Sequence, residues 1–204
     1  DLRDLPLIKR RNILSNWLKI NTSKRLDISE IIFFKDWNDL RQIKIESTEK
    51  FNQEGLMIKS KKSVYLSGRP RGLWFKWKKT PLFLDTILMY AQRGHGKRSS
   101  YYSDFTFGVL NNNAIVPIGK AYFGFTNEEL KKLDNWVRKN TINRFGPVRE
   151  VKKELVLEIA FDSINESKRH KSGLALRFPR IHRIRWDKPT NETDYLKDIK
   201  KAFF

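Results

Sequence analysis

Apolar residues recur at a helical spacing near the start of the chain. Leu7, Leu14 and Leu18 follow one another at heptad-like intervals after Pro6, a residue favoured in the first turn of a helix, and they predict an amphipathic helix. The polar stretch over residues 36–51 predicts a second helix. Short apolar or alternating runs predict strands instead, and here they cover residues 28–34, 63–66 and 73–79.

After Pro81 a new series of predicted strands begins. Five runs predict strands, with one helix between the third and the fourth. That helix starts with a capping box, in which Glu129 follows Thr126 by three residues. A last short helix is expected over residues 192–204, and the five strands over residues 84–92, 102–110, 115–123, 154–161 and 174–184.

The change of pattern places a domain boundary near Pro81, because proline disfavours continuation of a strand ladder. We therefore expect two domains, residues 1–81 and 82–204. Five short strands with a helix after the third are typical of an OB barrel, a fold that often binds nucleic acid, and other small barrels share this order. The whole chain is predicted to be an α+β protein.

The composition is strongly basic. The chain has 42 Lys and Arg against 23 Asp and Glu, a formal charge of +19, which predicts attraction to polyanions. Nucleic acid is the leading partner; a generally basic surface, a ribosomal protein or a membrane-surface protein is the alternative. The absence of cysteine excludes disulfides. Apolar runs are shorter than the roughly 20 residues of a membrane span, so we expect a soluble intracellular protein, and a start at Asp1 without methionine favours a fragment.

A window without any acidic residue, residues 55–84, contains eight Lys or Arg. Lys76 and Lys78 are two apart in a predicted strand, so they share one face, while Leu73, Phe75 and Trp77 take the other and can enter the core. Two ammonium groups on one face can neutralise the oxygens of a phosphoryl group. A solvated strand face is the plainer alternative.

Glu54 stands just ahead of this window and can act as a ligand for a hard cation, although a glutamate at a helix end, paired with lysine, is the commoner case. A second basic run covers residues 177–188, where the arginine fork suits phosphate oxygens and a solvated strand edge is the alternative. Glycines in the loop over residues 93–98 allow close approach to a phosphate. The cations that we expect to contact nucleic acid are Arg93, Lys97, Arg98, Arg177, Arg180 and Arg183.

Three runs together resemble the second half of the ATP-dependent DNA ligases of the small bacterial type. They are Glu-Gly-Leu-Met-Ile-Lys at 54–59, Trp-Phe-Lys-Trp-Lys-Lys at 74–79, and the run at 177–188 that ends in Arg-Trp-Asp-Lys. The resemblance implies the end of a nucleotidyltransferase domain of ATP-grasp-like type, followed by a five-stranded OB barrel with one inserted helix. The Lys-x-Asp-Gly run that carries the adenylated lysine in this family does not occur in the chain.

The resemblance also implies roles for single residues. Lys76 and Lys78 would hold the phosphate of AMP or ATP, and Glu54 would lie near the catalytic Mg²⁺ or Mn²⁺. Lys59 and Arg71 are weaker candidates for nucleotide binding. In the OB domain, Arg185 and Lys188 would orient the pyrophosphate of ATP, supported by Asp187.

In the family, ATP donates AMP to a lysine, AMP passes to the 5′-phosphate of a nick, and the 3′-hydroxyl then displaces it. We therefore expect the intact protein to seal nicked double-stranded DNA in replication, repair or recombination, as a cytoplasmic, nucleoid-associated monomer with other DNA-repair proteins as partners. This chain alone is predicted to be inactive in self-adenylation and to keep salt-dependent DNA affinity. An RNA ligase, an mRNA capping-type nucleotidyltransferase or a non-catalytic DNA-binding module is the alternative.

Overall fold

A computed structural model describes residues 1–50, 53–96, 99–168 and 170–204. The chain forms two compact units, an N-terminal unit of residues 1–79 and a C-terminal unit of residues 80–204. This division falls two residues ahead of the boundary expected from the sequence. No helix among the described residues is both long and apolar enough to cross a membrane.

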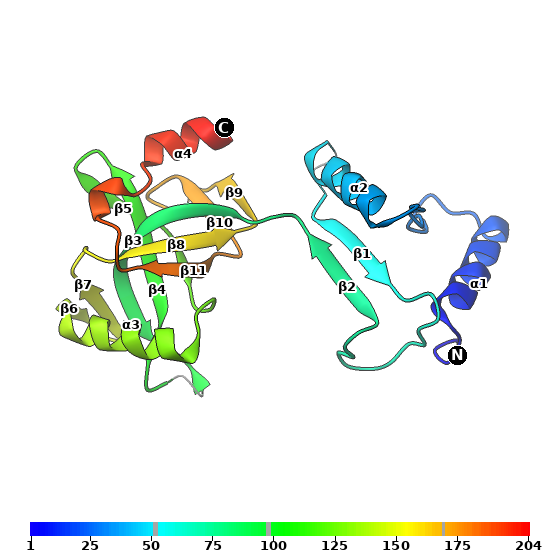
Figure 1. Ribbon diagram of the computed structural model, residues 1–204, viewed down its shortest axis with the longest axis horizontal. Coiled ribbons are helices and arrows are strands. Elements are labelled where there is room, and N and C mark those ends of the chain that lie inside the picture. Colours follow the sequence, from blue (N-terminus) through cyan, green and yellow to red (C-terminus); the bar gives the residue numbers. More distant parts are fainter. Residues whose placement is uncertain (51–52, 97–98, 169) are drawn as a thin grey trace. The chain divides into compact units, whose positions relative to one another are not determined.

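The described residues of the N-terminal unit form two helices and a two-stranded antiparallel sheet (Figure 1). Helix α2 begins after Asp36, whose carboxylate accepts hydrogen bonds from the amides of Asn38 and Asp39 at 2.8 and 3.0 Å. These bonds satisfy amide groups that have no partner inside the helix. The elements are α1 (Leu7–Ile20), α2 (Trp37–Glu49), β1 (Gly55–Lys59) and β2 (Trp74–Lys78).

Two of the predicted strands in this unit are wrong. Residues 28–34 form no strand, and Phe33 is 82% exposed. Residues 63–66 also form no strand; instead the carbonyl of Ser63 accepts a hydrogen bond from the amide of Leu7, and the amide of Tyr65 donates to the carbonyl of Arg3. An apolar run becomes a strand only when another segment supplies a ladder, and in the described part of this unit β1 and β2 pair only with each other.

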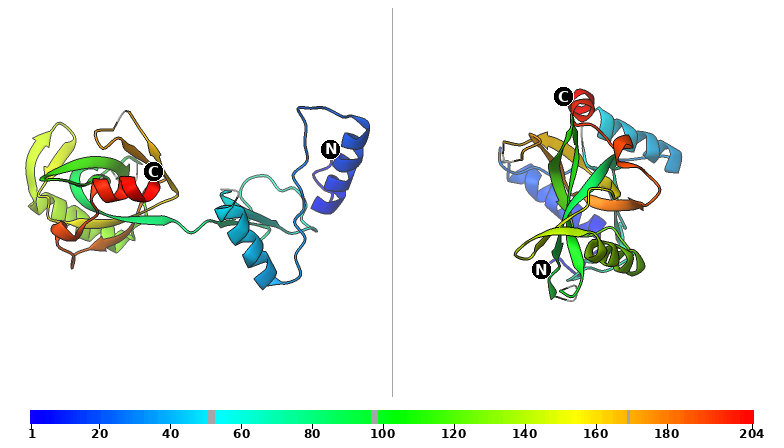
Figure 2. Two further views of the ribbon diagram at one scale, coloured as in Figure 1. Left: turned by 90° about the horizontal axis from the view of Figure 1, so that it is seen from above. Right: turned by 90° about the vertical axis from the view of Figure 1, so that its left-hand side faces the viewer.

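Helix α2 packs on one face of the β1–β2 sheet, as Figures 1 and 2 show. Leu56 on β1 lies opposite Trp77 on β2 and is buried, and the ammonium group of Lys44 on α2 lies 5.4 Å from the centre of the Trp77 ring. Phe75 points to the same face but is 55% exposed, so the expectation that it enters the core is wrong. A single short helix cannot cover the whole face, and the end that carries Phe75 stays open.

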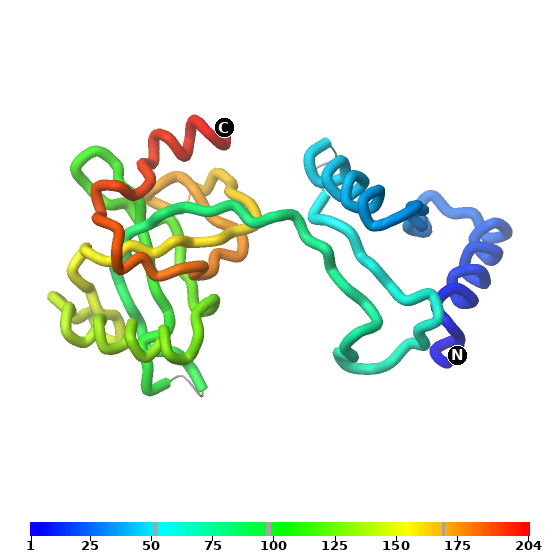
Figure 3. The backbone as a smooth tube through the Cα atoms, in the orientation of Figure 1, coloured from blue at the N-terminus to red at the C-terminus, as the bar shows by residue number. Residues whose placement is uncertain are grey.

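The C-terminal unit is built on a curled antiparallel sheet with the strand order β11-β8-β3-β4-β5. The amide of Ile181 donates to the carbonyl of Phe123, which joins the start of β11 to the end of β5 and curls the sheet into a partly open barrel (Figure 3). This is the strand order of an OB barrel. Its strands are β3 (Leu82–Arg93), β4 (Tyr102–Asn111), β5 (Ala114–Ala121), β8 (Val156–Phe161) and β11 (Arg180–Arg185).

Further elements decorate this barrel. Helix α3 (Asn127–Lys139) begins with the predicted capping box, in which the hydroxyl of Thr126 and the carboxylate of Glu129 each accept an amide hydrogen bond. The sequence did not predict the hairpin β6 (Thr141–Phe145) and β7 (Val148–Val151), which pairs with β3, or β9 (Ser163–Glu166). The last two elements along the chain are a 3₁₀ turn (Thr190–Glu192) and helix α4 (Leu196–Phe203).

The predicted strand over residues 174–184 is in fact two strands. It breaks between β10 (Leu174–Arg177), which pairs with β9, and β11. Phe178 at the break has a φ of +52°, a conformation that bulky residues rarely adopt, and Pro179 follows it. The break leaves Phe178 56% exposed at the surface.

Candidate functional site

Three lysines share the face of the β1–β2 sheet that helix α2 does not cover, which we call the lysine face. Register places Met57 opposite Lys76, Gly55 opposite Lys78 and Lys59 opposite Trp74, so all of these positions lie on the face away from Leu56 and α2. The ammonium group of Lys59 lies 4.5 Å from the centre of the Trp74 ring. The structure thus brings Lys76 and Lys78 to one face and adds Lys59 to it.

Glu54 stands at the end of this ladder beside Lys78. The amide of Lys79 donates to the carbonyl of Glu54 at 2.9 Å, and Gly55 pairs with Lys78. Gly55 has a φ of +133°, and a Cβ atom there would lie 2.2 Å from the carbonyl oxygen of Trp77. Only glycine therefore lets the chain turn from Glu54 into β1 at this distance from β2. The carboxylate of Glu54 is exposed.

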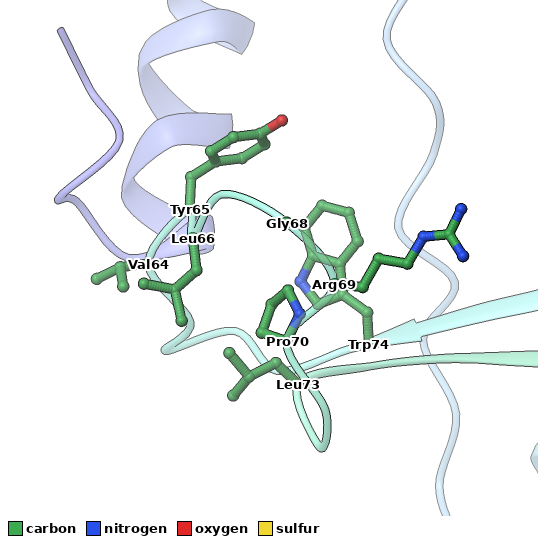
Figure 4. Close-up of a pocket in the computed structure, with 8 residues that line it drawn as sticks. All are labelled: Val64, Tyr65, Leu66, Gly68, Arg69, Pro70, Leu73 and Trp74. Carbon is green, nitrogen blue, oxygen red and sulfur yellow. The ribbon is translucent and has the colours of Figure 1, made fainter.

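A hollow adjoins the lysine face at the start of β2, where Trp74 lies (Figure 4). It lies in the connection between β1 and β2, and its walls are mainly apolar, with Trp74 on one side and Tyr65 on another. Arg69 lines it, whereas the predicted nucleotide-binding residue Arg71 is exposed in the same connection and is not part of the wall.

A second candidate site lies in the C-terminal unit, where Arg185 and Lys188 are each about one-fifth exposed. The guanidinium group of Arg185 donates to both carboxylate oxygens of Asp187, at 3.2 and 3.0 Å. These hydrogen bonds raise the pKa of Arg185 and lower the pKa of Asp187. The Nζ atom of Lys188 lies 2.6 Å from Oδ2 of Asp85.

Two of the acids in this network were not predicted from the sequence. Asp85 on β3 lies opposite Glu158 on β8, and each has a carboxylate oxygen 3.9 Å from Arg185. Each is the only acid in its strand, and the sequence offered no other signal for them. Asp194 accepts a hydrogen bond from the amide of Asp85 at 2.7 Å, and burial raises the pKa of this neighbouring carboxyl group.

The predicted DNA-binding residues divide into three groups. Lys97 and Arg98 lie outside the described residues. Arg177 stacks at 5.2 Å over the ring of Phe178, and Arg180 forms an ion pair with Asp162 at 3.0 Å. Arg183 is exposed on β11, opposite Glu158.

Arg93 belongs to a cluster that the sequence did not reveal. The guanidinium groups of Arg93, Arg138 and Arg149 lie 5.8, 5.4 and 5.9 Å from the centre of the Tyr102 ring. Asp134 forms an ion pair with Arg138 at 2.7 Å. Three cations around one ring form a concentrated positive surface suited to phosphate groups.

No group of three or more His, Cys, Asp or Glu side chains that could hold a metal ion occurs among the described residues. The N-terminal site offers Glu54, and no acid follows it until Asp85. Magnesium is often held by one or two carboxylates together with substrate phosphates, so Glu54 fits a metal whose other ligands come from the nucleotide.

Known proteins resemble the chain over both units. Residues 1–78 match the family model described as the ATP dependent DNA ligase domain, and residues 98–188 match the model of the ATP dependent DNA ligase C terminal region. A probable DNA ligase of Koribacter versatilis is 44% identical over 150 residues, covering 74% of this chain and 26% of its own length. A DNA ligase of Methanococcus aeolicus is 36% identical over 188 residues, covering 92% of this chain and 33% of its own length.

Solved structures share the fold. The structure named Pmar-Lig_PreS3 matches with a TM-score of 0.68 at 16% identity, over 89% of this chain and 40% of that one. A structure from a study of Lig E DNA ligases matches with a TM-score of 0.61 at 19% identity, over 89% of this chain and 59% of that one. The predicted fold class is thereby confirmed. The chain spans about a third or less of the two curated relatives named above, and it belongs to the ATP-dependent DNA ligase family.

Proposed function

We propose that the protein containing this chain seals nicks in double-stranded DNA with ATP as the donor of AMP. The observation that carries this proposal is the lysine face of β1–β2 in a chain of this family. Lys76 and Lys78 lie on one face next to the ladder end that bears Glu54. Positioned cations beside a carboxylate are what phosphoryl-group chemistry requires.

The residues divide the work by their chemistry. Lys76 and Lys78, with Lys59 beside them, neutralise the phosphate of the adenylate, and Glu54 supplies one ligand to Mg²⁺ or Mn²⁺. When bound, the metal neutralises phosphate charge. Arg185 and Lys188 bind the pyrophosphate of ATP during adenylation, and Asp187 orients Arg185 through its two hydrogen bonds.

DNA binding falls to the C-terminal unit. We assign its phosphate contacts to Arg177 at the end of β10, to Arg180 and Arg183 on β11, and to the cluster around Tyr102. Arg93, Arg138 and Arg149 present three guanidinium groups within 6 Å of one ring centre. Nicked duplex DNA is the partner that these charges fit, whereas a monomeric state, further DNA-repair partners and nucleoid association stay predictions.

The test is nick sealing by the intact protein with Lys76→Ala. We expect the rate to fall by about two to three orders of magnitude, the usual loss when one oxyanion-stabilising group is removed. Lys61→Ala is the matched control, because Lys61 is an exposed lysine in the connection after β1 and has no place on the ladder face. A Lys76 variant that seals nicks as fast as the control would contradict the proposal.

The alternatives predict other results. A non-catalytic DNA-binding module requires that neither Lys76→Ala nor Arg185→Ala affects sealing. An RNA ligase or capping-type enzyme requires that RNA be preferred over a DNA nick under the same salt conditions. Labelled ATP should leave no covalent adduct on the 204-residue chain alone, because the chain has no Lys-x-Asp-Gly run.

A further inference from the structure

The two cations expected to bind pyrophosphate are already neutralised inside their own unit. Arg185 has three carboxylates within 4 Å, those of Asp187, Asp85 and Glu158. Lys188 shares Asp85 with it at 2.6 Å. These two cations are therefore offset by three nearby acids, which weakens their attraction for a phosphate.

The acids fall into two kinds by position. Asp187 belongs to the same short run as Arg185 and supports its guanidinium plane through two hydrogen bonds. Asp85 and Glu158 come from β3 and β8 and face each other across the ladder. These two carboxylates therefore come from strands other than the one that ends in Arg185.

Asp85 is not fully satisfied by this arrangement. Its Oδ2 atom accepts the hydrogen bond from Lys188, but its Oδ1 atom is buried and has no hydrogen-bond partner in the described part of the chain. Its amide donates to the carboxylate of Asp194, so a second acid lies close by. A buried acceptor without a partner costs free energy, which is unusual for a contact with a purely structural role.

We propose that Asp85 and Glu158 form an internal counter-ion that competes with phosphate for Arg185 and Lys188, in which Asp85 contacts both cations and Glu158 contacts Arg185. Asp85 is thus a positioning residue that keeps both cations on the barrel until an anion with more charge replaces it. A phosphate group offers Arg185 and Lys188 a bidentate, fully charged partner, whereas Asp85 and Glu158 hold Arg185 only at 3.9 Å. This inference rests on the proposed function in one respect, because the proposed function identifies phosphate as the anion that Arg185 and Lys188 bind.

The test measures the binding of inorganic pyrophosphate to the 204-residue chain, followed by the amide NMR signals of residues 185–188. In Asp85→Asn we expect the affinity at these signals to rise about ten-fold, because one competing charge is removed and Lys188 is released. The gain should disappear in the double variant Asp85→Asn with Lys188→Met. An affinity in Asp85→Asn equal to or below that of the unaltered chain would overturn the proposal.

Glu150→Gln is the matched control. Glu150 holds Lys153 at 2.6 Å in the same unit and is 14% exposed, so its removal changes the net charge by the same amount and also releases one lysine. It should leave the signals of residues 185–188 unchanged. An equal rise at these signals in the control would show a general charge effect and would also overturn the proposal.

A second variant keeps the proposal testable if Asp85→Asn does not fold. Glu158→Gln removes one acid from Arg185 and the charged partner of His182 at 2.5 Å, but leaves the pair of Lys188 with Asp85 intact. It should give a smaller gain that is lost with Arg185→Gln, and no gain at all would contradict the inference. Because none of these measurements needs nick sealing, loss of the proposed activity and loss of this counter-ion can be told apart.

Discussion

Replacement of Gly55 by alanine should detach β1 from β2. The alanine Cβ would lie 2.2 Å from the carbonyl oxygen of Trp77 and 2.8 Å from Cα of Lys78, where ordinary contacts begin at 3.4 Å. Both atoms belong to the backbone, so no side chain can rotate away. The strands must move apart by more than about 1 Å, and at that distance hydrogen bonds weaken steeply.

The magnitude follows from two separate costs. A non-glycine residue at a positive φ costs roughly 1–3 kcal/mol, and each ladder hydrogen bond that opens costs about 1 kcal/mol. With two or three bonds lost near Gly55, the total is about 4 kcal/mol. Gly68→Ala isolates the first cost, because Gly68 also has a positive φ of +80° but has nothing within 4 Å of the added atom.

Amide hydrogen exchange of the 204-residue chain measures these costs locally. Two amides report on the two ends of the ladder, that of Lys79, which donates to Glu54, and that of Ser60, which donates to Leu73. Exchange at Lys79 should be at least 100-fold faster in Gly55→Ala than in Gly68→Ala, since 1.4 kcal/mol corresponds to a factor of ten. Equal rates in the two variants would refute the steric argument.

Three further results are expected. Asp134→Ala should destabilise the C-terminal unit by about 2–4 kcal/mol in urea unfolding, because it leaves the buried amide of Tyr102 without its 2.8 Å acceptor; a loss below 1 kcal/mol would contradict this. Burial raises the pKa of Asp194, so the stability linked to its protonated form is present in acid and lost as the pH rises through that pKa. Asp194→Asn should therefore be more stable than the unaltered chain by an amount that grows from about pH 3.5 to pH 7. A difference in stability that stays constant over this range would argue against the prediction. Arg149→Gln should lower the slope of log affinity for nicked DNA against log salt by about 0.9. An unchanged slope would exclude a phosphate contact of Arg149, and Glu150→Gln serves as the control at the neighbouring position.

Local chemistry explains which elements could be predicted. The starts of α2 and α3 follow from side chains that bond to amides two or three residues away, as Asp36 and Thr126 do. The run over residues 28–34 has the composition of a strand, but a strand also needs a partner that composition does not reveal. Pro179 was a visible signal for the break between β10 and β11, and the regular alternation on either side hid it.

Some parts of the candidate sites could likewise be predicted from the sequence, and others could not. Alternation alone places Lys76 and Lys78 on one face, because both belong to one strand. That Lys59 joins them depends on the β1–β2 register, which the sequence does not fix. Asp85 lies 103 residues before Lys188, and only the pairing of distant strands brings the two together.

The two cationic sites should therefore respond differently to salt. Lys76 and Lys78 are exposed, and the window around them has no acid, so ions in solution screen their attraction for a phosphate. Arg185 and Lys188 are mostly buried against fixed carboxylates, and salt screens such short contacts much less. Rising salt should then weaken phosphate binding at the lysine face while leaving the counter-ion network closed. Arg185 and Lys188 bind a phosphate only when this anion replaces Asp85 and Glu158 directly. The affinity of this site should therefore depend on the charge of the anion more than on the long-range field of the protein.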